Sequence, residues 1–164
     1  MDSSRNAESR SRPVVSEMTQ TSQQGASARG RCLCGAVRFE IHGPLRPIIY
    51  CHCAMCRRSN GHFAAATACA SAHLRLLSAQ TLHWYQSSAT SRRGFCGTCG
   101  SQLFWERVGS GHISIWAGAL DMPTGLRAAA HIFVAEKGDY YEVADGLPLW
   151  PGASPWPGNS PPEG

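Results

Sequence analysis

Cys51-His-Cys-Ala-Met-Cys56 is the middle one of three short cysteine clusters in this 164-residue chain. The other two are Cys32-Leu-Cys34 and Cys96-Gly-Thr-Cys99, so the clusters together hold seven of the eight cysteines. A cysteine thiolate is a strong zinc ligand, and a structural zinc ion takes four ligands in a tetrahedron. Because two cysteines one or two positions apart can place both sulfurs on one ion, the spacing predicts metal binding.

The two outer clusters supply four cysteines, which is the number that closes a structural zinc site. About sixty residues separate these clusters, so an ion that joins them also closes a large loop of the chain. Binding of a structural zinc ion contributes on the order of 10 kcal/mol to folding. We therefore predict a structural zinc site made by Cys32, Cys34, Cys96 and Cys99.

The middle cluster has three cysteines, Cys51, Cys53 and Cys56, and no evident fourth ligand. Three protein ligands leave one position of a zinc ion for water or substrate, which is typical of catalytic zinc. The ligand count therefore predicts two Zn²⁺ ions per chain, one structural and one reactive.

Disulfides are the alternative, since eight cysteines is an even number. Cys51, Cys53 and Cys56 are too crowded to suit three separate bridges, and the first apolar run begins only after residue 35, so no secretory signal is visible. In a reducing cytosol, clustered cysteines indicate metal binding or catalysis, and we expect a cytoplasmic protein. Cys69 lies alone among small residues and is expected to be a buried, inert thiol.

The composition argues against nucleic acid and membranes as partners. The formal charge of +4 falls to about +1 once seven thiolates and two zinc ions are counted, and nucleic-acid binding requires a concentrated basic face. No stretch approaches the roughly 20 apolar residues that span a bilayer. The oligomeric state stays open.

One domain, residues 29–150, is predicted between two tails. Residues 1–28 are polar and contain almost no large apolar side chains, so we expect disorder there, and Met18 is a second candidate start beside Met1. Residues 151–164 are rich in Pro and Gly and are expected to be extended or coil.

Short alternating segments predict an all-β fold. Val37, Phe39 and Ile41 alternate with polar residues, the period of a strand. No segment shows a helical stripe over three turns, and at most a short helical turn follows Cys53. The predicted strands cover residues 37–41, 48–50, 63–68, 73–77, 82–86, 103–106, 112–116 and 131–134.

Six segments of the sequence resemble one known family. The resemblance covers roughly residues 28–150 and lies in Gly30-Arg-Cys-Leu-Cys-Gly-Ala-Val-Arg-Phe39, Cys51-His-Cys-Ala-Met-Cys-Arg-Arg58, Phe95-Cys-Gly-Thr-Cys-Gly-Ser-Gln-Leu103, Gly118-Ala-Leu-Asp-Met-Pro123, His131-Ile-Phe-Val134 and Tyr140-Tyr-Glu-Val-Ala-Asp-Gly-Leu-Pro148. The chain is similar to the glutathione-dependent formaldehyde-activating enzymes, whose GFA domain is shared with centromere protein V. The resemblance implies a β-tent, an all-β fold of short antiparallel strands organised around zinc.

The resemblance also implies a function. It places the structural zinc on the two outer clusters and the catalytic zinc on the middle one. It implies a carbon–sulfur lyase that acts on an adduct of a small thiol, as in the formation or cleavage of S-hydroxymethylglutathione from glutathione and formaldehyde. A zinc ion with an open position can bind and deprotonate the glutathione sulfur. Three thiolates, however, leave the zinc site with a net charge of about −1, so it is a poorer Lewis acid than zinc on three neutral histidines.

Arginines beside the clusters are candidates to bind the substrate. Arg57 and Arg58 directly follow Cys56, and arginine binds carboxylates, of which glutathione has two. The alternative is that one arginine neutralises the thiolate-rich site. Arg92 and Arg93 precede the last cluster and could act in the same way.

Histidines are the candidates for proton transfer. His62 follows the middle cluster by six residues and is a catalytic candidate if it reaches the metal. His52 lies between two ligands, so its side chain is expected to point away from the metal. His131 and Asp145 match positions of the family, where a structural role is an equal alternative.

Two functions of other classes remain as alternatives. A non-catalytic scaffold module would follow from the likeness to centromere protein V, and tight binding to microtubules or DNA would favour it. A redox-sensing module would lose metal from the three-cysteine site on oxidation without showing thiol–aldehyde activity.

Overall fold

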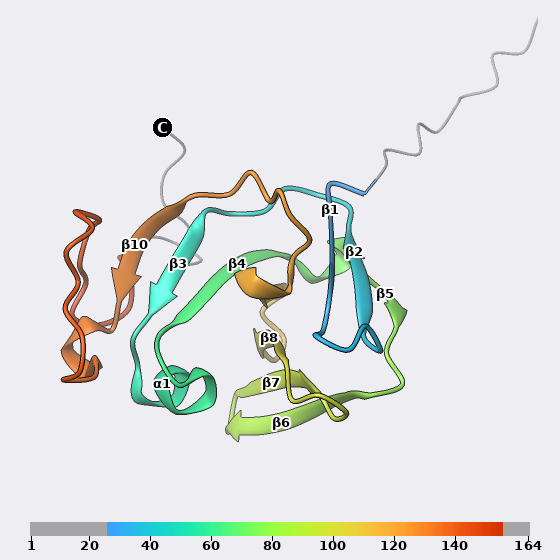
Figure 1. Cartoon of the computed structure of the whole chain (residues 1–164), viewed down its shortest axis with the longest axis horizontal. Helices are drawn as coiled ribbons and strands as arrows, with labels where there is room; N and C mark the ends of the chain where they lie inside the picture. Colours follow the sequence, from blue (N-terminus) through green and yellow to red (C-terminus); the bar gives the residue numbers. More distant parts are fainter. Residues whose placement is uncertain (1–25, 156–164) are drawn as a thin grey trace, which may run out of the picture.

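Two β-sheets make up the part of the chain that the computed structural model describes, residues 26–155 (Figure 1). The smaller sheet has three antiparallel strands in the order β1 (Ala28–Arg31), β2 (Arg38–Ile41) and β5 (Leu74–Ser78). The larger sheet has seven strands in the order β10 (Ala128–Ile132), β3 (Ile48–Cys51), β4 (Ala64–Ala70), β9 (His112–Trp116), β8 (Gln102–Arg107), β7 (Ser91–Cys96) and β6 (Leu82–Ser88).

Helix is scarce in the described residues. One α-helix, α1 (Ala54–Asn60), directly follows β3, and three single-turn 3₁₀ helices are η1 (Ser71–His73), η2 (Ala117–Ala119) and η3 (Val134–Glu136). The predicted all-β class with little helix is therefore confirmed. The strands pair antiparallel with one exception, because β10 runs parallel to β3.

Several elements differ from the sequence-based prediction. β1 and β7 were not predicted, and α1 extends over seven residues where at most a short helical turn was expected. The strand predicted at 131–134 instead covers 128–132, because Phe133 adopts a left-handed conformation with φ 55° and ends the strand.

The predicted tails fall mainly on residues 1–25 and 156–164, which lie outside the described part. At the inner boundary, Ser27 donates its backbone N–H to the carbonyl of Ile41 at 2.8 Å, and β1 begins at Ala28. Residues 151–153 and 155 form bends, and Gly152 accepts the backbone N–H of Phe133. Outside these contacts, the disorder expected for residues 1–28 and the extended or coil structure expected for residues 151–164 stay predictions.

Among the described residues, an apolar cluster joins the two sheets. Phe39 of β2 meets Phe104 of β8 edge to face, with ring centroids 5.1 Å apart, and both rings are fully buried. Val37, Ile41 and Ile115 complete the centre of this cluster. Burial of such side chains stabilises the domain by roughly 1.5–3 kcal/mol each.

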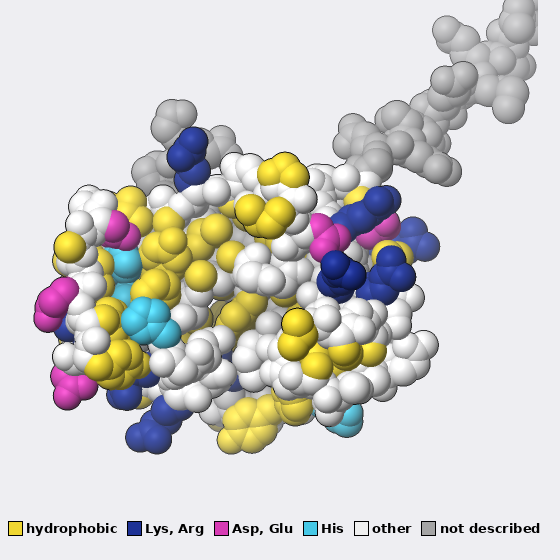
Figure 2. Space-filling view, in the orientation of Figure 1, with side chains coloured by type: hydrophobic (Ala, Val, Ile, Leu, Met, Phe, Trp, Pro, Cys, Tyr) yellow, Lys and Arg dark blue, Asp and Glu magenta, His cyan; other side chains and the backbone are white. Residues whose placement is uncertain are grey.

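Charged side chains of both signs lie next to one another on the smaller sheet. Figure 2 shows arginines beside acidic side chains over β1 and β2, where Arg29 bonds to Glu40 at 3.0 Å and Arg31 lies 3.7 Å from Asp121. In the described part of the chain, no helix is both long and apolar enough to cross a membrane.

Candidate metal centres

The two outer cysteine clusters come together between the two sheets. Cys32 and Cys34 lie in the turn between β1 and β2, whereas Cys96 ends β7 and Cys99 lies in the following turn. Their four sulfurs lie within 4.8 Å of one another, with 3.5 Å between Cys32 and Cys34 and 3.8 Å between Cys34 and Cys96. Zinc–sulfur bonds of about 2.3 Å in a tetrahedron put sulfurs about 3.8 Å apart. The group therefore fits a tetrahedral ion such as zinc.

Hydrogen-bond donors surround these sulfurs. Val37 donates its backbone N–H to Cys32 Sγ at 3.2 Å, and the Ser101 hydroxyl lies 3.2 Å from Cys99 Sγ. The bond from Ser101 lowers the pKa of the Cys99 thiol to about 5. Donors of this kind stabilise the thiolate form, which is the form that binds metal.

The middle cluster forms a second group at the start of α1. Cys51 is the last residue of β3, Cys53 caps the helix by accepting the backbone N–H of Cys56 at 3.4 Å, and Cys56 lies in the first turn. The three sulfurs lie within 4.8 Å of one another, and no further Cys, His, Asp or Glu from residues 26–155 joins them. This group can offer three ligands and leaves the fourth position open.

Hydrogen bonds to β9 and η3 hold α1 in place beside the three sulfurs. Trp116 donates its indole N–H to Asn60 at 2.5 Å, and the Asn60 amide donates to the carbonyl of Cys56 at 2.7 Å. At the other end, Ala54 donates its backbone N–H to the Glu136 carboxylate at 2.9 Å. The cluster is thereby tied to both β9 and η3.

Arg93 brings a positive charge to the three-cysteine group. Its two terminal guanidinium nitrogens lie 3.8 and 3.9 Å from Cys56 Sγ, and the residue is only 5% exposed. The neighbouring thiols of Cys51 and Cys56, with a further contribution from Arg93, hold the pKa of Cys53 well below its usual range. Three thiolates around a divalent ion carry a net charge of −1, which the buried cation offsets.

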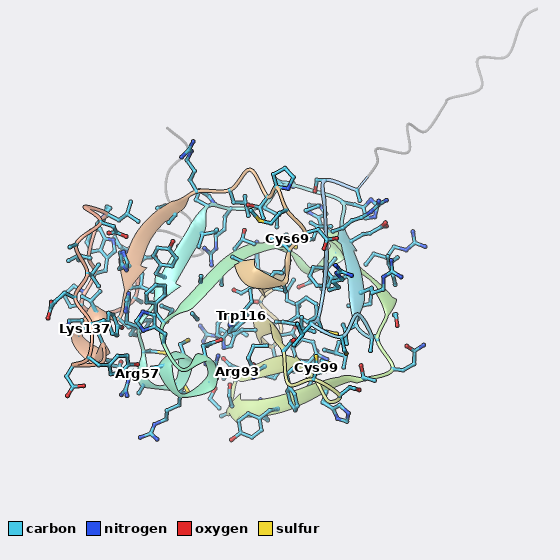
Figure 3. The ribbon with its side chains drawn as sticks, in the orientation of Figure 1. Arg57, Cys69, Arg93, Cys99, Trp116 and Lys137 are labelled. Carbon is cyan, nitrogen blue, oxygen red and sulfur yellow. The ribbon has the colours of Figure 1, made fainter. Side chains whose placement is uncertain are left out.

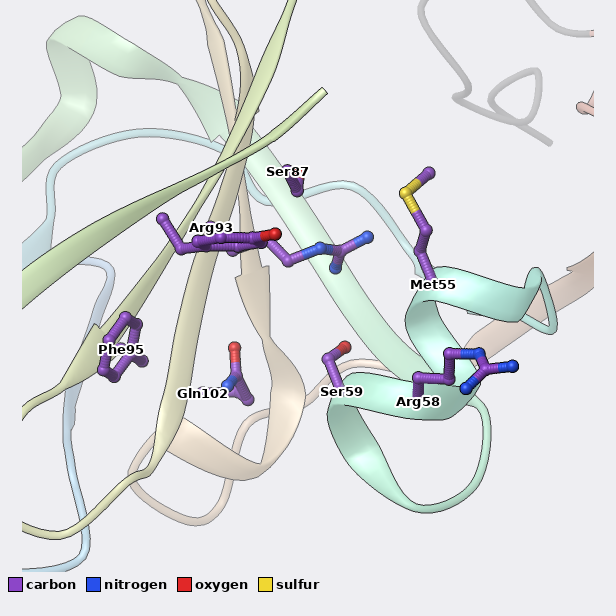
Figure 4. Close-up of a pocket in the computed structure, with 8 residues that line it drawn as sticks. Met55, Arg58, Ser59, Ser87, Arg93, Phe95 and Gln102 are labelled. Atoms are coloured by element: carbon purple, nitrogen blue, oxygen red, sulfur yellow. The ribbon is translucent and has the colours of Figure 1, made fainter. Parts of the chain in front are cut away.

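A cavity of about 190 Å³ lies against the three cysteines. It adjoins an outer groove of about 410 Å³, and both are lined by Met55 and Arg93. Figure 4 shows the groove, with Met55, Arg58 and Ser59 on α1 opposite Arg93 and Phe95 of β7. The two shared residues place the groove next to the cavity that the three cysteines line.

The structure separates the arginines and histidines that the sequence singled out. Arg58 lines the groove, but Arg57 lies on the other side of α1, toward Lys137 (Figure 3), and lines neither cavity nor groove. His62 is exposed and packs against Tyr141, with ring centroids 4.2 Å apart, so it does not reach the cysteines. Of the four arginines, Arg93 contacts the three-cysteine group, so it is the one positioned for the neutralising role.

Arg46 lines the cavity, although no sequence pattern singled it out. Its side chain donates to the carbonyls of Pro47 and Ala66 at 2.9 and 3.1 Å, and its Nε is buried without a partner among the described residues. Burial lowers the pKa of its guanidinium to about 10, so the group stays charged at neutral pH. The only signal for it is an arginine before a proline at the start of a strand.

His52 points away from the cysteines, as expected, and belongs to a chain of hydrogen bonds that runs from Tyr141 to Asp145. Its Nδ1 lies 2.5 Å from the Tyr141 hydroxyl and its Nε2 2.8 Å from His131 Nδ1, while His131 Nε2 lies 2.9 Å from Asp145. Because ionised Asp145 can only accept, His131 donates to it from Nε2. His52 then donates from its Nε2 to His131 Nδ1, and the Tyr141 hydroxyl donates to His52 Nδ1. Burial, with the nearby His131, lowers the pKa of His52 to about 4, which keeps it neutral.

Cys69 belongs to neither metal group. It is buried in the core at 4% exposure, and burial raises the pKa of its thiol to about 11. A protonated, enclosed thiol is unreactive, in agreement with the prediction for this residue.

Comparison with known proteins places the chain in a family. No curated protein matches it. A crystal structure of a Rhodobacter sphaeroides protein matches with 24% identity and a TM-score of 0.48, covering 74% of this chain and 98% of the other. The family model described as glutathione-dependent formaldehyde-activating enzyme matches residues 27–136, a range that contains all three cysteine clusters. The chain therefore belongs to the glutathione-dependent formaldehyde-activating enzyme family.

Proposed function

We propose that this protein is a zinc-dependent carbon–sulfur lyase that forms or cleaves the adduct of a small thiol with an aldehyde. Glutathione is the thiol that the family description suggests, and S-hydroxymethylglutathione is the corresponding adduct of formaldehyde. The observation that carries the proposal is the contrast between the two metal groups. Four sulfurs complete one of them, whereas three sulfurs leave the other open toward a cavity.

The two groups would have different roles. Cys32, Cys34, Cys96 and Cys99 would hold a structural zinc ion, and Cys51, Cys53 and Cys56 would hold the catalytic one. When bound there, the catalytic zinc leaves one coordination position for the substrate sulfur and favours the thiolate form of that sulfur.

Arg93 would stabilise the charge that develops during the reaction. As the substrate thiolate attacks the aldehyde carbon, a C–S bond forms and the carbonyl π electrons move to the oxygen, which then takes a proton from water. A cation in the wall of the cavity stabilises this oxygen while it is negative. In the reverse direction the hydroxyl gives its proton to water, the C=O bond forms as the C–S bond breaks, and the sulfur leaves as a thiolate that takes a proton from water.

The outer groove would hold the rest of the thiol. Its volume of about 410 Å³ lies in the range of small-molecule sites, and Arg58 in its wall can bind a carboxylate of glutathione. We place the protein in the cytoplasm, where thiols stay reduced.

Exchange at equilibrium tests the proposal. Glutathione and formaldehyde also combine without an enzyme, so NMR exchange rates of S-hydroxymethylglutathione are compared with wild-type protein, with Cys53→Ser and without protein. We expect faster exchange with the wild type only. Equal rates for both proteins, together with an unchanged spectrum of the cobalt-substituted protein on addition of glutathione, would leave a non-catalytic scaffold or redox-sensing module as the function.

A further inference from the structure

The cavity beside the three-cysteine group is larger than a one-carbon substrate requires. Its volume is about 190 Å³, whereas an apolar cavity of about 150 Å³ in another protein holds a benzene molecule. Even with a metal ion and a substrate sulfur beside the cysteines, a hydroxymethyl group would leave much of this space empty. Unfilled space in a binding site forfeits the packing that stabilises a bound substrate.

The walls of the cavity are mainly apolar and come from five strands of the larger sheet. Ile49, Ala64, Ala66, Trp105, Trp116 and Ile132 line it. Figure 2 shows apolar side chains in a hollow in the middle of the face that it presents. Ala64 and Ala66 lie side by side on one face of β4 and are 2% and 9% exposed. Their small side chains create the space, because larger residues at these two positions would fill it.

Phe133 completes the wall in a conformation that is unfavourable for phenylalanine. Its φ of 55° lies in the left-handed region, which bulky residues rarely adopt. The contacts that hold it are the bond from its own N–H to the Gly152 carbonyl at 2.8 Å and the bond from the Glu136 N–H to its carbonyl at 3.1 Å. Strained residues of this kind cluster at binding sites, and here the strained residue lines the cavity.

The two cations of the cavity have partners in the protein, but Arg46 Nε has none among the described residues, and the function proposed above assigns Arg93 to the reacting oxygen. Arg46 donates to the carbonyls of Pro47 and Ala66, and Arg93 faces Cys56 Sγ. The remaining surface suits an uncharged group. Resting on the function proposed above, we infer that the preferred carbon partner is an aldehyde with an uncharged apolar group of about four to seven carbon atoms, a size comparable to benzene, and not formaldehyde.

Binding of unreactive thioethers tests this inference without catalysis. S-benzyl-, S-methyl- and S-carboxymethylglutathione are titrated into the zinc-loaded protein by calorimetry. We expect S-benzylglutathione to bind at least about 10-fold more tightly than S-methylglutathione, since each methylene in an apolar pocket contributes about 10-fold or more to discrimination. Equal binding of the benzyl and methyl compounds, or tightest binding of the carboxymethyl compound, overturns the inference.

A matched pair of variants places the effect in the cavity. Ala66→Val adds two methyl groups inside it and is expected to reduce the benzyl-to-methyl ratio of affinities at least about 3-fold. Ala68→Val adds the same groups to the same strand outside the lining and should keep the wild-type ratio. Melting curves show whether each variant is folded, and the wild-type series decides the question if Ala66→Val is not.

Two further measurements separate this inference from the proposed function. In the first, phenylmethanethiol changes the spectrum of the cobalt-substituted site more than ethanethiol does, and no glutathione thioether binds. That result supports the apolar cavity and rejects glutathione as the thiol substrate. In the second, the formaldehyde adduct exchanges at least as fast as the benzaldehyde adduct, and the methyl and benzyl thioethers bind equally. That result supports the proposed function and overturns this inference.

Discussion

Arg93 on β7 directs both terminal nitrogens of its guanidinium toward the sulfur of Cys56 on α1, at 3.8 and 3.9 Å. The two residues are 37 positions apart in the sequence, and both are buried. A buried cation is stable only beside compensating negative charge. The contact therefore links the protonation and metal content of the three-cysteine group to the packing of β7 against α1.

Replacement of Arg93 should weaken the three-cysteine site. We expect Arg93→Met to lower zinc affinity at this site about 10–100-fold, the usual effect of losing a group that supports metal ligands, and Arg93→Lys to lower it less. Chelator competition measures the affinity. Arg92→Met is the control, because Arg92 bonds to Glu106 at 2.6 Å and lies over Trp84 at 4.3 Å, away from the cysteines. Wild-type affinity in Arg93→Met would show that the cation plays no electrostatic role.

The chain should bind two zinc ions. Elemental analysis of protein purified without chelator is expected to give two zinc ions per chain, and Cys69→Ser should leave that number unchanged, because Cys69 lies in neither cluster. One zinc ion per chain, or iron in place of zinc, would contradict the two-site interpretation.

The two sites should differ in what their loss does. Cys99→Ser is expected to unfold or aggregate the domain, because the four-cysteine group joins the β1–β2 turn to the end of β7. Cys53→Ser should stay folded, with one zinc ion fewer and no activity. Circular dichroism and thermal melting compare the variants, and identical behaviour would remove the division into a structural and a reactive site.

The hydrogen-bond chain that ends at Tyr141 should stabilise the fold. Tyr141→Phe removes the donor to the buried His52 Nδ1 and leaves that nitrogen unpaired, which costs about 1–3 kcal/mol of unfolding free energy. Tyr140→Phe is the matched control, since its exposed hydroxyl makes only a 3.4 Å bond to Gly61, and its effect should stay within about 0.5 kcal/mol. Urea unfolding measures both, and equal effects of the two substitutions would mean that the chain contributes no stability.

Short spacing explains why the metal groups could be predicted. Cys32 and Cys34, and likewise Cys96 and Cys99, can place two sulfurs on one ion whatever the rest of the fold does, so each pair is a local property. That the two pairs share one ion was inferred from the ligand count, because four ligands close a structural zinc site. The all-β class is also local, because alternation of apolar and polar residues has the period of a strand. The structure brings together the same two groups that the sequence indicates.

Tertiary packing explains what was missed. Ser91-Arg-Arg-Gly-Phe-Cys96 lacks an alternating pattern, because Arg93 faces buried sulfur and not solvent, so β7 could not be recognised. The last strand begins at Ala128, three residues earlier than predicted. Alanine is a weak strand former, so residues 128–130 showed no strand pattern, and they belong to the strand because it pairs with β3. Neither feature is visible without the partner strand.

The sequence by itself determined the cysteine pairs, the three-cysteine cluster and the all-β class, because these depend on neighbours a few positions apart, and the ligand count of four joined the two outer pairs. Only the tertiary structure decided what surrounds the open site. It brought Arg93 to Cys56, kept His62 and Arg57 out of the cavity, and formed apolar walls from strands distant in sequence. The physical reason is that the size and charge of a cavity depend on how separate elements pack against one another, and no local pattern encodes that packing.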